Sequence, residues 1–186
     1  MIFEKLQDIN EPDLLELLQA FQAIMKKETF SKRQLLHEEG TVCDYLFLIQ
    51  TGIARSFYYK DGKEITAHFA VENTSITAID SFVQRKKSRY NIEVLEDSEV
   101  ISISHQDLYT LLEEKPQYEK YVRMFLEQIY VDLAERIEDL LFHTAKERYD
   151  KIIENTPDLL QRVQLKHIAS FIGITQETLS RIRTQV

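Results

Sequence analysis

The polar side chains near the end of the chain are of the types that read base pairs. Plotted as a helix over 175–186, they share an arc of about 160°, separate from an apolar arc of about 60°. Arginine donates to guanine, glutamine pairs with adenine, glutamate accepts from cytosine, and serine or threonine reaches phosphates. This face predicts contact with double-stranded DNA, although a solvated surface has a similar composition. The polar arc consists of Gln176, Glu177, Ser180, Arg181, Arg183 and Thr184.

A short apolar helix and a glycine turn precede this polar helix. Gly173 stands where the first helix has to end, a position that favours a positive φ. Thr175 is a good N-cap for the second helix. Two short helices joined in this way predict a helix-turn-helix. The apolar face of the first helix consists of Leu165, Ile168, Ala169 and Ile172.

The charge of the chain is unevenly distributed. The 186 residues carry a formal net charge of −8, but residues 160–186 carry +3, so the preceding ones carry −11. A chain that coats nucleic acid with its whole surface would be basic throughout. The distribution indicates that only the C-terminal segment meets a polyanion, unless the asymmetry is a chance fluctuation in a short segment.

The composition excludes several classes of protein. No uncharged stretch exceeds ten residues, whereas a membrane helix needs about 20, so we expect no membrane partner. The N-terminus lacks the apolar segment of a signal peptide, which makes the cytoplasm the expected compartment. With one cysteine and five scattered histidines, the sequence has no recognisable metal or catalytic motif. We therefore expect no metal and no enzyme activity.

The first half of the chain has the pattern of a helix followed by a roll of strands. Helical spacing of apolar residues predicts a helix over 11–27, with Asn10 as its N-cap. From about 28 to 104, short β-like runs alternate with turns, and Asp61-Gly62 between two such runs is a strong hairpin signal. Many short strands separated by glycine turns predict an antiparallel roll or barrel.

The second half of the chain has helical patterns. We expect a short helix over 105–115, a long one over 117–143 and another over 144–155. The long helix would extend about 40 Å and carries apolar residues on more than one face. We interpret it as a dimer seam rather than as a central core helix, because it is so long in a small protein.

The segment 168–183, with its Gly173-Ile174-Thr175 turn and its Glu177-Thr178-Leu179-Ser180-Arg181 core, resembles the helix-turn-helix of the Crp/Fnr family of bacterial transcription regulators. Glu39-Gly40, 45–52 and 61–64 resemble glycine turns of that family's cyclic-nucleotide-binding roll. The resemblance implies an α+β fold with an N-terminal antiparallel β-roll of the jelly-roll (double-stranded β-helix) type and flanking helices. A long dimerisation helix and a C-terminal helix-turn-helix would follow. The domains implied are a sensor roll over 1–115, a dimerisation helix over 116–143 and a DNA-binding domain over 144–186.

The resemblance also implies a function and a set of contact residues. It implies a homodimer that binds double-stranded DNA at a pseudo-palindromic site, with half-sites about 34 Å apart, and that has RNA polymerase as a further partner. Matched by position, the base contacts are Gln176, Glu177 and Arg181. The phosphate contacts are Lys166, Thr175, Thr178, Ser180 and Arg183.

The same resemblance leaves an alternative function open and predicts that DNA binding is weakened in one respect. The alternative is a ligand-binding or protein-interaction module that keeps the roll and has a degenerate DNA-binding domain. Many relatives continue into a β-wing beyond the position of Val186, so we expect fewer phosphate contacts. Together with the acidic body, this predicts binding that depends strongly on salt.

The roll departs from the pattern of members that bind cyclic AMP, which carry Gly-Glu and, further on, Arg followed by Ser or Thr and Ala. The matching segment 75–82 has no glycine, and Ser88 stands where the arginine belongs. A slip of one residue would bring Arg89 to that place but turn its side chain to the other face of the strand. We expect no tight cyclic-nucleotide binding and identify no cofactor. The basic residues Arg85, Lys86, Lys87 and Arg89 could contact another anion or form a solvated loop.

Overall fold

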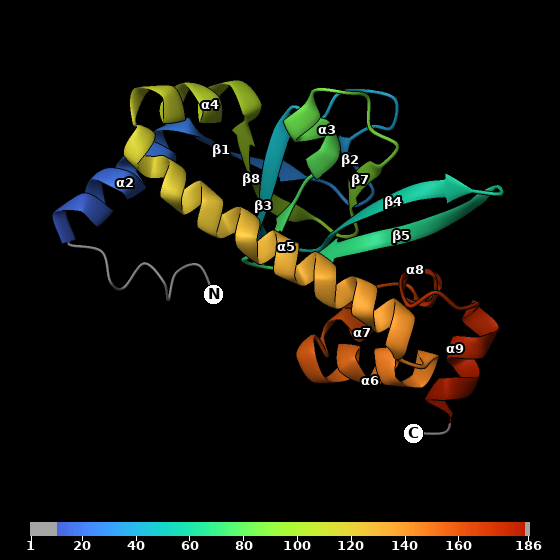
Figure 1. The fold of residues 1–186 in the computed structure, drawn as a ribbon. Coiled ribbons are helices and arrows are strands. Elements are labelled where there is room, and N and C mark those ends of the chain that lie inside the picture. Colours follow the sequence, from blue (N-terminus) through green and yellow to red (C-terminus); the bar gives the residue numbers. More distant parts are fainter. Residues whose placement is uncertain (1–10, 185–186) are drawn as a thin grey trace.

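The computed structural model describes residues 11–184, so the proposed Asn10 cap and the apolar side chain of Val186 lie outside the described residues. Two four-stranded antiparallel sheets form a roll, in the strand orders β1-β8-β3-β6 and β2-β7-β4-β5 (Figure 1). The antiparallel roll predicted from the sequence is confirmed. The strands are β1 (Met25–Phe30), β2 (Leu35–His37), β3 (Tyr45–Thr51), β4 (Ala54–Lys60), β5 (Lys63–Ala70), β6 (Ser75–Ile76), β7 (Asn91–Val94) and β8 (Ser98–Ser104).

The core of the roll lies between the two sheets. Phe47 and Ile49 of β3 and Val100 of β8 come from one sheet, and Ala54 of β4 and Val94 of β7 come from the other. All five are buried. Because alternate residues of a strand point to the same side, each strand directs one set of apolar side chains into this core.

The first helix is shorter than predicted. Helix α2 spans Glu11–Ile24, whereas the apolar spacing predicted a helix to residue 27. Met25 is instead the first residue of β1, where it pairs with Ile103 of β8. Pairing with β8 satisfies the backbone groups of this stretch, and tertiary context of this kind overrides local helical preference.

Several short elements had no counterpart in the sequence analysis. Strands β2 and β6 and helices α3 (Ile79–Gln84) and α7 (Leu159–Arg162) are two to six residues long. A periodic pattern of apolar residues is recognisable only over longer segments. These elements are set by contacts with the rest of the fold.

The Asp61-Gly62 hairpin is confirmed. Strands β4 and β5 pair over their whole length, and Lys60 lies opposite Lys63 at the turn. Both central residues have positive φ, 52° at Asp61 and 72° at Gly62. This is the backbone conformation of the type I′ turn that a two-residue hairpin favours.

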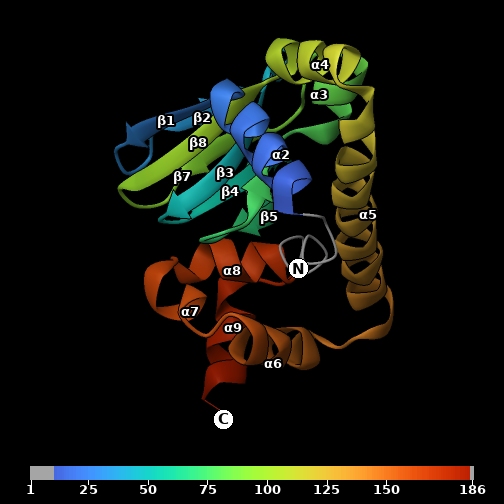
Figure 2. The ribbon, with the colours of Figure 1, turned by 90° about the vertical axis from the view of Figure 1, so that its left-hand side faces the viewer.

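The helices of the second half form one long rod and a C-terminal group. Helix α5 contains 24 residues and runs along one side of the molecule from the roll to the C-terminal helices (Figure 2). Thr144 and Glu147 form a capping box at the start of α6. The helices after the roll are α4 (His105–Glu114), the 3₁₀ turn η1 (Pro116–Tyr118), α5 (Glu119–Phe142), α6 (Ala145–Asn155), α7, α8 (Leu165–Phe171) and α9 (Gln176–Arg183).

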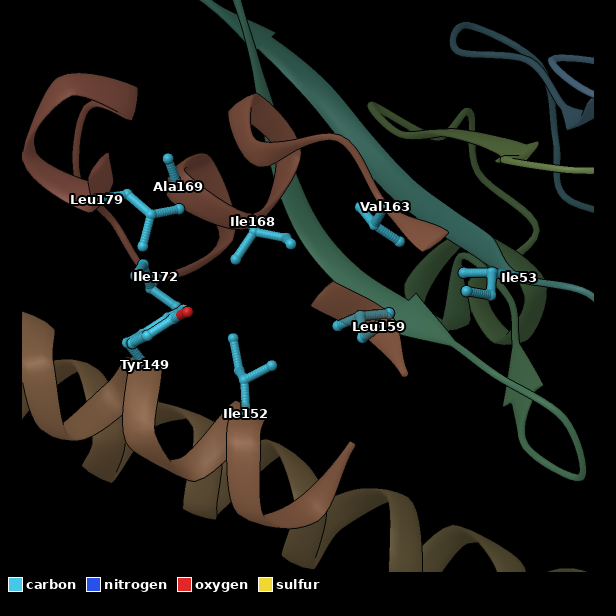
Figure 3. Packing of buried hydrophobic residues seen from close by; sticks show 9 residues of the cluster. All are labelled: Ile53, Tyr149, Ile152, Leu159, Val163, Ile168, Ala169, Ile172 and Leu179. Carbon is cyan, nitrogen blue, oxygen red and sulfur yellow. The ribbon is translucent and has the colours of Figure 1, made fainter. Parts of the chain in front are cut away.

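A second apolar core holds the C-terminal helices together and reaches the roll. Tyr149 and Ile152 of α6 lie on the same cluster as Ile168 of α8 and Leu179 of α9 (Figure 3). Ile53, which precedes β4 in the roll, belongs to this cluster as well. The helix-turn-helix is therefore packed against the sheet that contains β4 and β5.

The surroundings of Gly52, between β3 and β4, and of Gly62, in the β4–β5 turn, predict different losses of stability when each glycine is replaced by alanine. Gly52 has a φ of 99°, and a Cβ there would overlap the Ser98 side chain and lie 3.0 Å from its Cα. Gly62 also has a positive φ, but a Cβ there would meet nothing within 4 Å. We expect Gly62→Ala to cost about 1–2 kcal/mol of unfolding free energy and Gly52→Ala clearly more, because strain and overlap add. Urea unfolding of the two variants measures the difference, and equal costs would contradict this explanation.

Candidate nucleic-acid interface

The predicted helix-turn-helix is present and is capped as expected. Gly173 has a φ of 76° and separates α8 from α9. The Thr175 side chain accepts a hydrogen bond from the backbone N–H of Thr178, with a distance of 3.3 Å between Oγ1 and N. Leu179 is fully buried against the rest of the domain. The sequence therefore orients α9 by its N-cap and its one buried side chain.

The polar face of α9 is open to solvent. The proposed base-contacting residues Gln176, Glu177 and Arg181 are all exposed. Of the proposed phosphate contacts, Thr178 is half-buried, and the others are exposed: Lys166, Thr175, Ser180 and Arg183. All the predicted residues belong to α8, to α9 or to the turn between them, and these two helices lie at the C-terminal end of the molecule (Figure 1).

Glu177 is held in its charged form. A hydrogen bond from the Thr175 side chain lowers the pKa of Glu177, and its own backbone N–H and the nearby charges of Arg181 and Lys63 act in the same direction. A carboxylate is repelled by phosphates, but it can accept a hydrogen bond from the amino group of cytosine. Glu177 is therefore suited to discriminate between bases rather than to add affinity.

A buried guanidinium ties α8 to the roll, and the sequence analysis missed it. Arg55 of β4 is only 2% exposed. Its Nε donates to Glu93 at 2.6 Å and its Nη2 donates to Glu64 at 2.6 Å. Its Nη1 donates to Thr66 at 3.2 Å and to Nδ1 of His167 on α8 at 2.7 Å. A charged residue within the apolar run 53–57 was the signal that could have revealed this cluster.

Further polar contacts join the same two parts. The backbone N–H of Thr66 on β5 donates to the Ser170 hydroxyl on α8 at 3.2 Å. Arg162 of α7 forms ion pairs with Glu72 and Glu96, which lie in two loops of the roll. The hydrogen bonds from Arg162 lower the pKa of Glu72 to about 2. None of these contacts is visible in a local sequence pattern, because each joins residues far apart in the chain.

Two arginines hold the end of α8 from the opposite side. Arg136 of α5 donates to the carbonyl of Phe171, and its guanidinium lies 3.9 Å from the centroid of the Phe171 ring. Arg148 of α6 donates from Nε to the carbonyl of Ile172 at 2.9 Å. The last carbonyls of a helix have no partner within it and carry partial negative charge, so two guanidinium groups stabilise this end.

The basic loop of the roll is partly neutralised. Arg85 forms an ion pair with Asp44, and Lys86 lies 3.4 Å from Asp80. Lys87 and Arg89 are exposed. Ser88, at the place where cyclic-AMP-binding members carry arginine, is buried, and its hydroxyl accepts a hydrogen bond from the N–H of Tyr90 at 2.9 Å.

Residues 11–184 also lack the features of two other classes of site. No three His, Cys, Asp or Glu side chains in this range are grouped so that they could hold a metal ion. In the same range, no helix combines the length and the apolar composition that crossing a bilayer requires.

Comparison with known proteins finds relatives of this chain. A model of the cyclic nucleotide-binding domain matches residues 27–115. The chain is 26% identical to the anaerobic regulatory protein of Bacillus subtilis (strain 168) over 191 residues, covering 94% of this chain and 77% of that protein. Residues 27–115 therefore match a cyclic nucleotide-binding domain, and the chain is a homologue of a regulator of the Crp/Fnr family. Proteins of this family are transcriptional regulators, not enzymes; they bind DNA and act as dimers.

Solved structures of this family share the fold. CLP of Xanthomonas campestris, a c-di-GMP-responsive global regulator, superimposes with a TM-score of 0.69 at 15% identity, covering 92% of this chain and 90% of that one. FixK2 of Bradyrhizobium japonicum gives 0.69 at 18% identity, covering 87% and 84%. The roll, the long helix and the C-terminal helices of this chain are arranged as in these two regulators.

The His167 contact predicts how stability depends on pH. Burial and the charges of Arg55 and Lys166 lower the pKa of His167 to about 4, so its ring is neutral and Nδ1 can accept from Arg55. The unfolded chain, with a pKa of 6.5, takes up the proton first, so stability falls as the pH falls below 6.5. We expect His167 to account for a loss of about 2 kcal/mol between about pH 7 and pH 5.

Urea unfolding of the wild type and of His167→Asn at both pH values measures this contribution. Asparagine keeps an acceptor near the position of Nδ1 and does not titrate, so the variant should lose the His167 part of the pH dependence. Glu72, whose pKa is about 2, loses its stabilising effect only at lower pH and does not obscure the result. The same pH dependence in both proteins would contradict the assigned role of His167.

Proposed function

We propose that this protein is a homodimeric, DNA-binding transcriptional regulator that reads a pseudo-palindromic site through α9. The observation that carries this proposal is the exposed polar face of a capped helix within a helix-turn-helix. Gln176, Glu177 and Arg181 contact base edges in the major groove. The surrounding phosphates are contacted by Lys166, Thr175, Thr178, Ser180 and Arg183.

The dimer forms through α5. This helix carries a continuous apolar seam with the alternating spacing of four and three residues that a coiled coil requires. Its members are between 42% and 75% exposed in the single chain, so a partner helix could cover them. Two helix-turn-helix units would then reach successive major grooves, about 34 Å apart. The seam consists of Leu126, Tyr130, Leu133, Ile137 and Leu140.

The roll serves as a sensor that lacks the usual grip on a cyclic nucleotide. Ser88 is too short to pair with a phosphate where other members use arginine, and it is already engaged with Tyr90. Any anion attracted to this region would meet Lys87 and Arg89, since Arg85 and Lys86 have carboxylate partners. The three domains extend over 1–115, 116–143 and 144–186. The protein acts in the cytoplasm, on DNA and on RNA polymerase bound beside it.

Arg181 provides the test of base reading. Arg181→Ala should weaken binding to a selected site by about 1–3 kcal/mol per half-site and relax the preference at one base pair in each half-site, because a bidentate contact with guanine is lost from each protomer. Arg123→Ala is the control: Arg123 is also exposed but lies on α5, where it pairs with Glu127 at 2.5 Å. Gel-shift titrations measure both. A wild type that binds no duplex at any salt concentration would instead support the ligand-binding or protein-interaction module.

Ile137 provides the test of the dimer. Ile137→Lys should produce a monomer under conditions where the wild type sediments as a dimer, because a charge enters the apolar seam. The monomer should also lose most of its affinity for a site with two half-sites. Glu135→Lys, on the same helix but away from the seam, adds a lysine and should leave the dimer intact. Analytical ultracentrifugation distinguishes the outcomes, and a dimeric Ile137→Lys protein would rule out this seam.

A further inference from the structure

The turn of the β4–β5 hairpin, Lys60-Asp61-Gly62-Lys63, carries two lysines and one aspartate and has a net charge of +1. Lys60 and Lys63 lie directly opposite one another at the last cross-strand pair, and both are exposed. No ion pair within residues 11–184 includes either lysine. Like charges placed directly opposite across two strands destabilise a hairpin. Because the turn is already specified by Asp61 and Gly62, the two lysines are not required for its geometry.

The fold brings this turn close to α9, the helix proposed to read base pairs. Strand β5 contacts α8 through the hydrogen bond from the backbone N–H of Thr66 to the Ser170 hydroxyl. Lys63 is three residues before Thr66 on the same strand. The turn of the hairpin and α9 lie on the same side of the molecule (Figure 1). The ammonium group of Lys63 is near enough to Glu177, in the first turn of α9, to contribute to lowering its pKa.

We propose that Lys60 and Lys63 form a second DNA contact, in which the hairpin turn binds backbone phosphates beside the base pairs read by α9. This inference rests on the proposed function, since it requires that α9 enters a major groove. The groove is about 12 Å wide and bordered by phosphates on both sides, so a basic turn next to the first turn of the inserted helix lies near one of these borders. A phosphate also supplies an ion-pair partner, which neither lysine has within residues 11–184.

Duplex DNA fits these lysines better than an acidic protein surface does. Lys166 and Arg181 are also exposed, Lys166 on α8, which contacts β5, and Arg181 on α9, which contacts α8, so further basic side chains lie on the elements next to the hairpin. The body of the protein is strongly acidic, and the net charge is −8. An isolated basic surface in such a protein attracts a polyanion over a longer range than the few charges of a protein contact.

The test is the salt dependence of binding to a mixed-sequence duplex by the full-length Lys60→Ala/Lys63→Ala variant. Each phosphate contact contributes about 0.9 to the slope of log affinity against log salt, so removing two from each protomer of the proposed dimer should reduce the slope by about 3–4 between about 50 and 200 mM salt. The affinity should fall equally for specific and non-specific duplexes, because phosphates carry no sequence information. The unfolding free energy should not decrease, since a repulsive pair is removed.

The control is Lys26→Ala/Lys27→Ala, which removes the same charge from β1 in the other sheet. This control should change the slope little, and a similar loss in both variants would overturn the proposal by showing that only total charge matters. An unchanged slope in the hairpin variant would overturn it as well, and would leave an acidic protein as the partner of this turn. Tighter DNA binding by the variant would overturn it by showing that the hairpin obstructs the duplex. If the wild type binds no duplex, the proposed function itself fails.

Discussion

The orientation of the helix-turn-helix depends on the buried guanidinium of Arg55. A charge that is only 2% exposed has to be fully partnered, and its partners come from β5, β7 and α8. Removing one partner of a buried pair typically costs about 3–5 kcal/mol, because the remaining charge is left without compensation. Helix α8 therefore does not separate from the sheet without exposing the Arg55 cluster to water. The direction in which α9 points is set by the roll.

The long helix acts on the same element from the other side. Phe171 at the end of α8 packs against Phe69 of β5, with ring centroids 5.1 Å apart, and beneath Arg136 of α5. The roll, the proposed dimer helix and the helix-turn-helix thus meet at one aromatic ring. Packed interfaces of this kind tend to have discrete arrangements rather than to deform continuously. A small shift of α5 in the proposed dimer would therefore move α8, and with it the face that we propose to contact DNA.

Local signals in the sequence predicted the parts of this design that local chemistry determines. The Asp61-Gly62 turn, the positive φ of Gly173 and the cap at Thr175 each depend on residues within one turn of the chain. The predicted end of the first helix was wrong, because residues 25–27 belong to β1 and pair with β8 instead. The contact between Arg55 and His167 was missed since 112 residues separate them. Only the folded chain shows which distant charges meet.

The acidic body of the protein would influence both the affinity and the sequence specificity of the proposed DNA binding. Exposed charges more than about 10 Å apart are largely screened at moderate salt, so repulsion between the acidic body and the like-charged DNA would act mainly at close range. Non-specific binding depends on phosphate contacts, and it is weakened most by such repulsion. The base contacts proposed for Gln176, Glu177 and Arg181 would not depend on net charge in this way. With the proposed function, an acidic body would therefore leave a larger share of the affinity to the correct sequence and favour release from all others.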